Sequence, residues 1–185
     1  MFRRILIAAA VAAIAVPSLA SAQSRQMPSA ERIIQQLERS PRMQVAPQRR
    51  VTIEQFKRRP ELRRAAPSID IQSINFAFGS AEIPYSQYGK VEQIARAMHR
   101  MIERRGRARF LLEGHTDAVG SDYSNFVLSQ QRANTLAYVL VNEFGVPRRA
   151  LETVGYGEED LLVPTPYENW QNRRVTLRRV DQFIR

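Results

Sequence analysis

Cysteine is absent from this chain of 185 residues. Its absence excludes disulfide bonds and thiolate metal ligands, and it removes the side chain that a bacterial lipoprotein acylates after its signal segment. Histidine is almost absent as well, because His99 and His115 are the only two. We therefore expect no metal site, no cofactor and no lipid anchor.

Long apolar runs are also missing. The longest, Ile5 to Val16, has 12 residues, whereas a helix that spans a membrane needs about 20. Arg3 and Arg4 precede this run and the small residues Ala20-Ser21-Ala22 follow it. This order is typical of a secretory signal peptide. We expect residues 1–22 to be removed on export, by the general or the twin-arginine route, leaving no transmembrane segment in the mature chain.

Lysine occurs only at positions 57 and 90, so the net charge of +10 is carried almost entirely by arginine. Residues 23–66 hold 11 basic and 4 acidic side chains, whereas residues 67–185 hold 15 and 14. The basic segment has one aromatic residue, Phe56, and therefore no platform on which bases could stack. We expect no nucleic-acid partner, and we interpret residues 23–66 as a docking arm for an anionic surface or an envelope protein.

The same segment is rich in proline, glutamine and arginine, and its prolines at 28, 41, 47 and 60 divide it into short pieces. We predict a largely disordered arm with two short helices. Ser29 caps the first, and Thr52 with Gln55 forms the capping box of the second, where Val51 and Phe56 fit a hydrophobic staple. Helices this short are expected to form only against a partner or the globular part.

Residues 67–185 are predicted to form one globular domain. The apolar periodicities predict a strand over 69–78, a helix over 86–103, a strand near 110, a helix over 125–144 and strands over 151–156 and 174–180. This β-α-β-α-β-β order favours an α/β two-layer sandwich, with a mixed sheet and both helices on one face. Parallel strand pairs would each be joined through a helix.

The stretch from 111 to 133 has the pattern of a buried strand, a polar loop and the start of a helix, with Ser124 or Asn125 as the helix cap. Asn125, Ser129 and Arg132 lie at i, i+4 and i+7, so they share one helical face. Asp117 lies just upstream. An acid and an arginine near a helix start are typical of a site for a ligand with paired charges. A surface ion pair is the alternative that the residues alone leave open.

An enzyme is the less favoured interpretation. Glu113, His115 and Asp117 alternate along the predicted strand, but no nucleophile motif accompanies them, and His99 lies inside a predicted helix. We predict that His115 is a structural residue that hydrogen-bonds within its loop. Asn172-Arg173-Arg174 is left open between an anion site and a solvated strand entrance.

Positions 74–180 resemble the OmpA-like, peptidoglycan-associated domain. The resemblance rests on Glu113-Gly114-His115-Thr116-Asp117 with Gly120, Asn125-x-x-Leu128-Ser129-x-x-Arg132-Ala133, Gly155-Tyr156-Gly157-Glu158 and Asn172-Arg173-Arg174-Val175. It implies non-covalent binding of the diaminopimelate residue of Gram-negative peptidoglycan, with Asp117 and Arg132 as the residues that hold it. Tyr123-Ser124 and Glu168-Asn169-Trp170 depart from the pattern of the family.

The chemistry of the ligand agrees with this assignment. Diaminopimelate ends in an ammonium and a carboxylate on one carbon, so it needs an acid and a donor. Asp117 and Arg132 supply these groups, Thr116 and Asn125 are expected to add hydrogen bonds, and Arg173 and Arg174 are secondary candidates. We expect a non-enzymatic protein of the Gram-negative periplasm, peripherally associated with the outer membrane. The alternative is an attachment subunit of a secretion or motor complex that acts through residues 23–66.

Overall fold

The computed structural model describes residues 26–74, 76 and 80–185. The predicted signal peptide and Phe78 of the first predicted strand lie outside the described residues.

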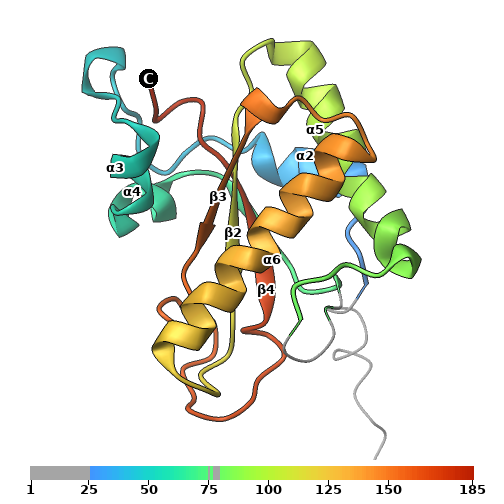
Figure 1. Ribbon diagram of the computed structural model, residues 1–185. Helices are drawn as coiled ribbons and strands as arrows, with labels where there is room; N and C mark the ends of the chain where they lie inside the picture. Colours follow the sequence, from blue (N-terminus) through green and yellow to red (C-terminus); the bar gives the residue numbers. More distant parts are fainter. Residues whose placement is uncertain (1–25, 75, 77–79) are drawn as a thin grey trace, which may run out of the picture.

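Four strands form one mixed sheet in the order β1-β4-β2-β3 (Figure 1). They are β1 (Ser68–Ile71), β2 (Phe110–His115), β3 (Leu151–Gly155) and β4 (Arg174–Arg179). β2 is parallel to β3, and β4 is antiparallel to both β1 and β2. The predicted class and element order are confirmed. One detail differs from the prediction of several parallel pairs, each joined through a helix. β4 lies between β1 and β2, so β2–β3 is the one neighbouring parallel pair among the described strands.

Two long helices cover one face of the sheet. α5 (Tyr88–Arg105) follows the 3₁₀ turn η2 (Tyr85–Gln87) and ends at Gly106, whose φ of 62° favours glycine. α6 (Asp122–Asn142) starts earlier than predicted. Its N-cap is Ser121, which forms a reciprocal capping box with Ser124, so the predicted cap at Ser124 or Asn125 is wrong. Asn125 therefore lies within the helix.

The larger apolar core lies between this face and the helices. Phe110 and Leu112 of β2 alternate inward with Val175 and Leu177 of β4, and all four side chains are essentially inaccessible to solvent. β1 is shorter than the strand predicted over 69–78, since the chain leaves the sheet after Ile71. No helix in the described part of the chain is both long and apolar enough to cross a membrane.

Residues 26–66 pack against the sheet and its helices. They form α2 (Ala30–Leu37), η1 (Pro47–Arg49), α3 (Ile53–Lys57) and α4 (Pro60–Ala65). Both predicted helices are confirmed, since Ser29 accepts a hydrogen bond from the Arg32 amide and the Thr52–Gln55 capping box is complete. The prediction of a largely disordered arm is wrong for these residues. Each short helix buries one apolar stripe, which the proline and arginine content of the segment obscured.

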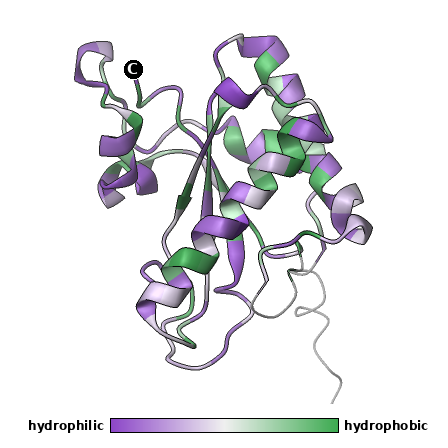
Figure 2. Cartoon of the chain, viewed as in Figure 1, coloured by the Kyte–Doolittle hydropathy of each residue, from purple (hydrophilic) through white to green (hydrophobic). Residues whose placement is uncertain are grey.

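The short helices lie on opposite sides of the sheet. α2 packs beside α5, whereas α3 and α4 lie on the far face (Figure 1). There Phe56 and Leu62 join Leu111, Val180 and Phe183 in a second, smaller core. Hydrophobic residues recur along α5 and α6, but α3 and α4 are mostly hydrophilic (Figure 2). The segment before the predicted domain thus adds a third layer to the sandwich of the sheet with α5 and α6.

Candidate functional site

Glycines allow α6 to lie directly on β2 and β3. A Cβ at Gly114 would stand 2.0 Å from the carbonyl oxygen of Ser129, and one at Gly155 would stand 2.5 Å from the Ser129 hydroxyl. Real Cβ atoms do not approach other heavy atoms this closely. The close approach brings the start of α6 against the loops that follow the two strands.

Gly157 joins those two loops to the helix. Its N–H donates to the Ser129 hydroxyl at 2.8 Å, and its carbonyl accepts from the Thr116 N–H at 2.9 Å. The Thr116 side chain is buried, and its hydroxyl has no hydrogen-bond partner among the described residues. The backbone of Thr116 is therefore fixed, whereas its hydroxyl has no partner within the described residues.

Asn125 holds the loop that carries Asp117. Its Nδ2 lies 3.3 Å from the carbonyl oxygen of Asp117, 3.2 Å from that of Val119 and 2.6 Å from Oε2 of Glu158. A side-chain amide has two hydrogens to donate. The donor group of Asn125 is thus engaged within the protein, where it positions the loop.

Asp117 is paired with Arg173. Arg173 Nη1 donates to Asp117 Oδ2 at 2.8 Å and to Glu168 Oε1 at 2.6 Å. Although partial burial opposes its charge, hydrogen bonds to Asp117 and Glu168 raise the pKa of Arg173. Asp117 is 7% exposed, and among the described residues its Oδ1 has only a long contact of 3.5 Å, from the Val119 N–H. One carboxylate oxygen of Asp117 is therefore neutralised by Arg173, and the other is nearly unengaged.

Arg132 is a buried cation without an acidic partner among the described residues. Its Nε donates to the carbonyl oxygen of Ser80 at 3.1 Å, and its guanidinium carbon lies 4.9 Å from the centre of the Phe76 ring. Burial lowers the pKa of Arg132, the charge of Arg173 lowers it further, and Asp117 opposes the shift. The two terminal nitrogens form no hydrogen bond within the described part of the protein, so they remain for an anion.

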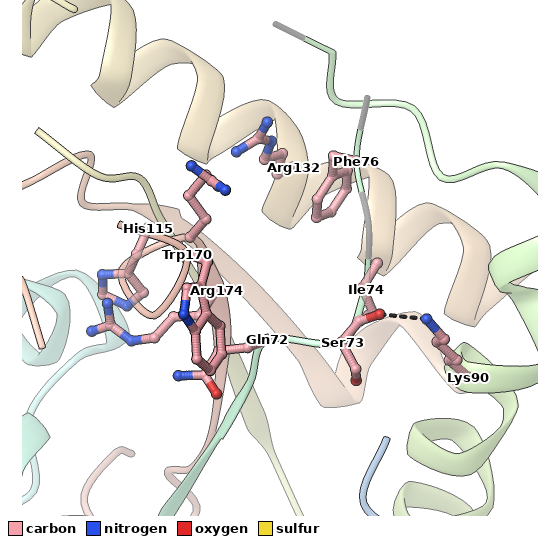
Figure 3. A pocket seen from close by; sticks show the side chains of 10 residues that line it. Gln72, Ser73, Ile74, Phe76, Lys90, His115, Arg132, Trp170 and Arg174 are labelled. Atoms are coloured by element: carbon pink, nitrogen blue, oxygen red, sulfur yellow. Dashed lines mark hydrogen bonds between the residues drawn. The ribbon is translucent and has the colours of Figure 1, made fainter. Parts of the chain in front are cut away.

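A pocket of about 320 Å³ opens beside Arg132. In Figure 3, Arg132 reaches from α6 toward Phe76, with Trp170, Arg174 and His115 on the other side. Lys90 donates to the carbonyl oxygen of Ser73 at 2.7 Å (Figure 3). The lining includes Lys90 and the arginines at 132, 173 and 174, and none of the described residues that line it is acidic. This charge suits a carboxylate.

Arg174 and Asn172 have mainly structural contacts. Arg174 is buried, donates to the carbonyl oxygen of Asp160 at 2.9 Å and lies 3.4 Å from Asp70 Oδ1. Asn172 exchanges two hydrogen bonds with the backbone of Val163. Within this motif, Arg173 lies at Asp117, and Arg174 lines the pocket while its hydrogen bond to Asp160 fixes a loop.

Neither Glu113 nor His115 forms a hydrogen bond with Asp117 among the described residues. Arg178 donates to both carboxylate oxygens of Glu113, at 2.7 and 2.8 Å. His115 is 2% exposed, and neither ring nitrogen has a hydrogen-bond partner among the described residues, so the predicted hydrogen bond within the loop is wrong. Burial, reinforced by Arg174 and Arg178, lowers the pKa of His115 well below its usual value. No cluster of metal-ligating side chains occurs in the part of the chain that the structure describes.

Sequence reasoning missed several residues of the pocket. Phe76 and Lys90 line it from the connection after β1 and from α5, and no local spacing marks them as pocket residues. Ser80, whose carbonyl oxygen holds Arg132, was missed for the same reason. Trp170 was noted only as a departure from the family pattern, yet it lines the pocket. The pairing of Asp117 with Arg173 was missed as well, because 56 residues separate the two in sequence.

A family model described as the OmpA family matches residues 75–174. The chain belongs to the OmpA family. It is 36% identical over 85 residues to outer membrane porin F of Pseudomonas aeruginosa, covering 46% of this chain and 23% of the porin. It is 41% identical over 73 residues to the peptidoglycan-associated lipoprotein of Pseudomonas putida, covering 38% of this chain and 43% of the lipoprotein. The chain thus spans less than half the length of these two relatives.

A solved structure shares the fold. The periplasmic domain of Helicobacter pylori MotB superimposes with a TM-score of 0.51 at 21% identity, covering 60% of this chain and 74% of that chain. At this identity the likeness concerns the fold alone. The resemblance predicted from the motifs is confirmed as membership of the OmpA family.

Proposed function

We propose that this protein binds peptidoglycan non-covalently, through the diaminopimelate of the stem peptides, in the periplasm of a Gram-negative bacterium. The observation that carries the proposal is Arg132, a buried cation that has no acidic partner among the described residues and that lines a cationic pocket beside Asp117. Membership of the OmpA family and similarity to a protein named peptidoglycan-associated lipoprotein support it.

The free end of diaminopimelate matches the two groups in charge. Its carboxylate would accept hydrogen bonds from the terminal nitrogens of Arg132. Its ammonium would donate to Oδ1 of Asp117 while Arg173 stays on Oδ2, since a carboxylate can accept several hydrogen bonds at once. Thr116 would add its buried hydroxyl, and Asn125 would act through the loop that it holds. Arg173 is assigned to the orientation of Asp117, and Arg174 to the wall of the pocket.

Binding by one stem peptide is expected to be modest. A hydrogen bond to a charged group contributes about 1.5–3 kcal/mol net. Peptidoglycan presents many copies of the peptide, so neighbouring sites and rapid rebinding would retain the protein on the wall. The proposal assigns no catalytic step, and Glu113 is held by Arg178 in an ion pair.

Sedimentation with isolated cell wall tests the site. Asp117→Asn and Arg132→Gln are each expected to lose most of the bound fraction, because each removes one charge of the pair. Glu168→Gln is the matched control, since Glu168 contacts the same Arg173 but its side chain is 72% exposed. Circular dichroism melts should show that all three variants remain folded. Wild-type sedimentation of both site variants would place the binding site elsewhere.

The identity of the recognised group is tested by comparing cell walls whose stem peptides contain diaminopimelate or lysine. Lysine at the same position of the stem peptide keeps the ammonium but lacks the carboxylate that Arg132 would bind. We expect retention on diaminopimelate-type wall and little on lysine-type wall, with Arg132→Gln abolishing the difference. Equal retention of the wild-type protein on both would refute diaminopimelate as the recognised group while leaving wall binding intact.

Attachment to an envelope complex through residues 23–66 is the alternative function. Residues 26–66 pack on the sheet and on α5, so a partner would have to bind the outer surface of α2, α3 and α4 rather than a free arm. Exposed arginines such as Arg32, Arg58 and Arg64 remain available there. Loss of localisation with intact wall binding, on replacement of these three, would favour this alternative.

A further inference from the structure

The loops that follow the parallel pair β2–β3 are acidic, whereas the loops that precede it are basic. At the carboxyl ends of the strands, segments 116–124 and 156–171 contain six acidic residues and no lysine or arginine. At the amino ends, segments 103–109 and 143–149 contain six arginines and two acidic residues. The register, with Phe110 opposite Leu151 and Gly114 opposite Gly155, places each pair of segments at one end of the sheet.

Most of these arginines are exposed. Arg109 is half-buried, and a further exposed arginine, Arg39, lies beside the other five. We call these six exposed residues the basic pole: Arg39, Arg104, Arg105, Arg107, Arg148 and Arg149. Arg39 belongs to it because its neighbour Glu38 lies 3.9 Å from Arg104 and 3.7 Å from Arg105. In Figure 1 the end of α5 and the turn before β3 lie together at the top, and the loop that carries Asp117 lies at the bottom.

Helix dipoles account for only part of this cluster. Arg104 and Arg105 lie in the last turn of α5, where a positive charge is favourable in any protein. Arg107 follows that helix, and Arg149 lies in the 3₁₀ turn η3 (Arg148–Ala150). Neither of these two has an acidic partner among the described residues, so ion pairing does not explain them.

We propose that the basic pole contacts the anionic phospholipid headgroups of a membrane leaflet while the opposite end holds the wall. That this membrane is one facing the periplasm rests on the proposed function, whereas the basic pole is a feature of the structure whatever the function is. Guanidinium groups bind phosphate oxygens in a bidentate geometry. None of the large exposed hydrophobic side chains lies in segments 103–109 or 143–149. The contact is therefore electrostatic and peripheral, without insertion.

The strength of such a contact follows from its charge. Each basic residue near an anionic leaflet raises the partition coefficient by about fivefold. Replacing an arginine by glutamate removes one favourable charge and adds a repelling one. Raising the ionic strength from about 0.1 M to about 1 M shortens the Debye length from about 10 Å to about 3 Å and should release the protein.

The test is sedimentation of the purified protein with vesicles of phosphatidylcholine, with and without phosphatidylglycerol. We expect binding only to the anionic vesicles, released by salt. Arg107→Glu/Arg149→Glu should lower it by about tenfold or more. Arg58→Glu/Arg64→Glu is the control, because it changes the net charge equally at two exposed arginines, one just after α3 and one on α4. The control should lose less than about threefold.

Several results would overturn the proposal. Equal losses in the two double variants would mean that net charge alone acts, and equal binding to neutral vesicles would exclude an electrostatic contact. Unchanged binding of Arg107→Glu/Arg149→Glu would exclude this surface. Sedimentation of the same variants with cell wall separates the two proposals, because the vesicle variants should keep wild-type wall binding.

Discussion

The neighbouring strands β2 and β4 present two different faces: one is mainly apolar, and the other combines apolar side chains with buried charges. Toward α5 and α6 they present Phe110, Leu112 and Leu177, which join the larger core. Toward α3 and α4 they present Glu113 and Arg178, which are 1% and 9% exposed. Both faces are buried, but the second also holds the ion pair of Arg178 with Glu113 between the sheet and its cover.

The difference lies in what each face requires of its cover. An apolar face needs only a complementary surface, whereas buried charges need hydrogen-bond partners in defined positions. Arg178 donates to Glu113 and also to the backbone carbonyls of Arg63 and Ala66. Arg63 in turn stacks on Tyr156, 3.8 Å from the ring centre, and bonds to Asp160. Residues 57–66 thus complete a polar network rather than simply covering the sheet.

The largest expected effect concerns the apolar face. Gly114→Ala would place a methyl group 2.0 Å from the Ser129 carbonyl oxygen and force α6 away from β2. We expect a loss of about 5 kcal/mol or more in the free energy of unfolding, measured by urea denaturation. Gly89→Ala is the control, since a Cβ there meets no atom within 4 Å. A Gly114→Ala variant as stable as Gly89→Ala would show that α6 does not lie against β2 as described.

The next effect concerns the charged face. Glu113→Ala leaves Arg178 buried without its acid, and we expect a loss of about 3–5 kcal/mol in the free energy of unfolding. Glu113→Leu/Arg178→Met should recover most of it, because the uncompensated charge is gone. Removal of the exposed partner in Glu92→Ala, where Arg96 lies 2.6 Å away, should cost at most about 0.5 kcal/mol. If the double variant is no better than Glu113→Ala, the network contributes more than charge pairing.

A smaller loss is expected where α3 packs on the charged face. Phe56 is fully buried, with its ring centre 5.6 Å from that of Phe183. Phe56→Ala should lower the free energy of unfolding by about 3 kcal/mol and expose residues 50–66 to limited proteolysis. Met43→Ala, at a side chain 43% exposed ahead of that stretch, should change neither measurement. Protease resistance of Phe56→Ala would argue against packing of this segment through α3.

The smallest effect is pH-dependent and concerns His115. Burial lowers the pKa of His115 in the folded state. On acidification the unfolded chain therefore binds a proton at this side chain that the folded protein does not bind. Stability is therefore lost as the pH falls below about 6.5, by up to about 1.4 kcal/mol per pH unit. His115→Gln should remove this contribution, so that urea unfolding at pH 7.5 and 5.5 shows a shallower slope than wild type. Equal slopes would place His115 in contact with solvent.

The apolar face of the fold could be predicted from the sequence, because local periodicity encodes it. The apolar run of β2, the alternation in β4 and the three- and four-residue spacing in α5 identified the core. Gly106 marked the end of α5, and Gly145 lies just beyond the end of α6. The start of α6 was missed, since Ser121 beside Gly120 has the composition of a turn as well as of a cap.

The charged face could not be predicted in the same way. Its contacts join residues far apart in sequence, such as Glu113 with Arg178, and charged side chains usually indicate a solvated surface. The composition of residues 26–66 therefore suggested disorder. At the candidate site, the motifs located Asp117 and Arg132, but only the fold could reveal that Arg173 occupies one oxygen of Asp117.

The pairing of Val51 with the last residues of the chain has a consequence for synthesis. Val51 donates to the carbonyl oxygen of Phe183 and accepts from the N–H of Arg185. Phe56 in the same segment packs on Phe183. Residues 50–66 leave the ribosome more than a hundred residues before these partners. The layer on the charged face can therefore close only after translation of residue 183, and until then this stretch is exposed to proteases and to chaperones.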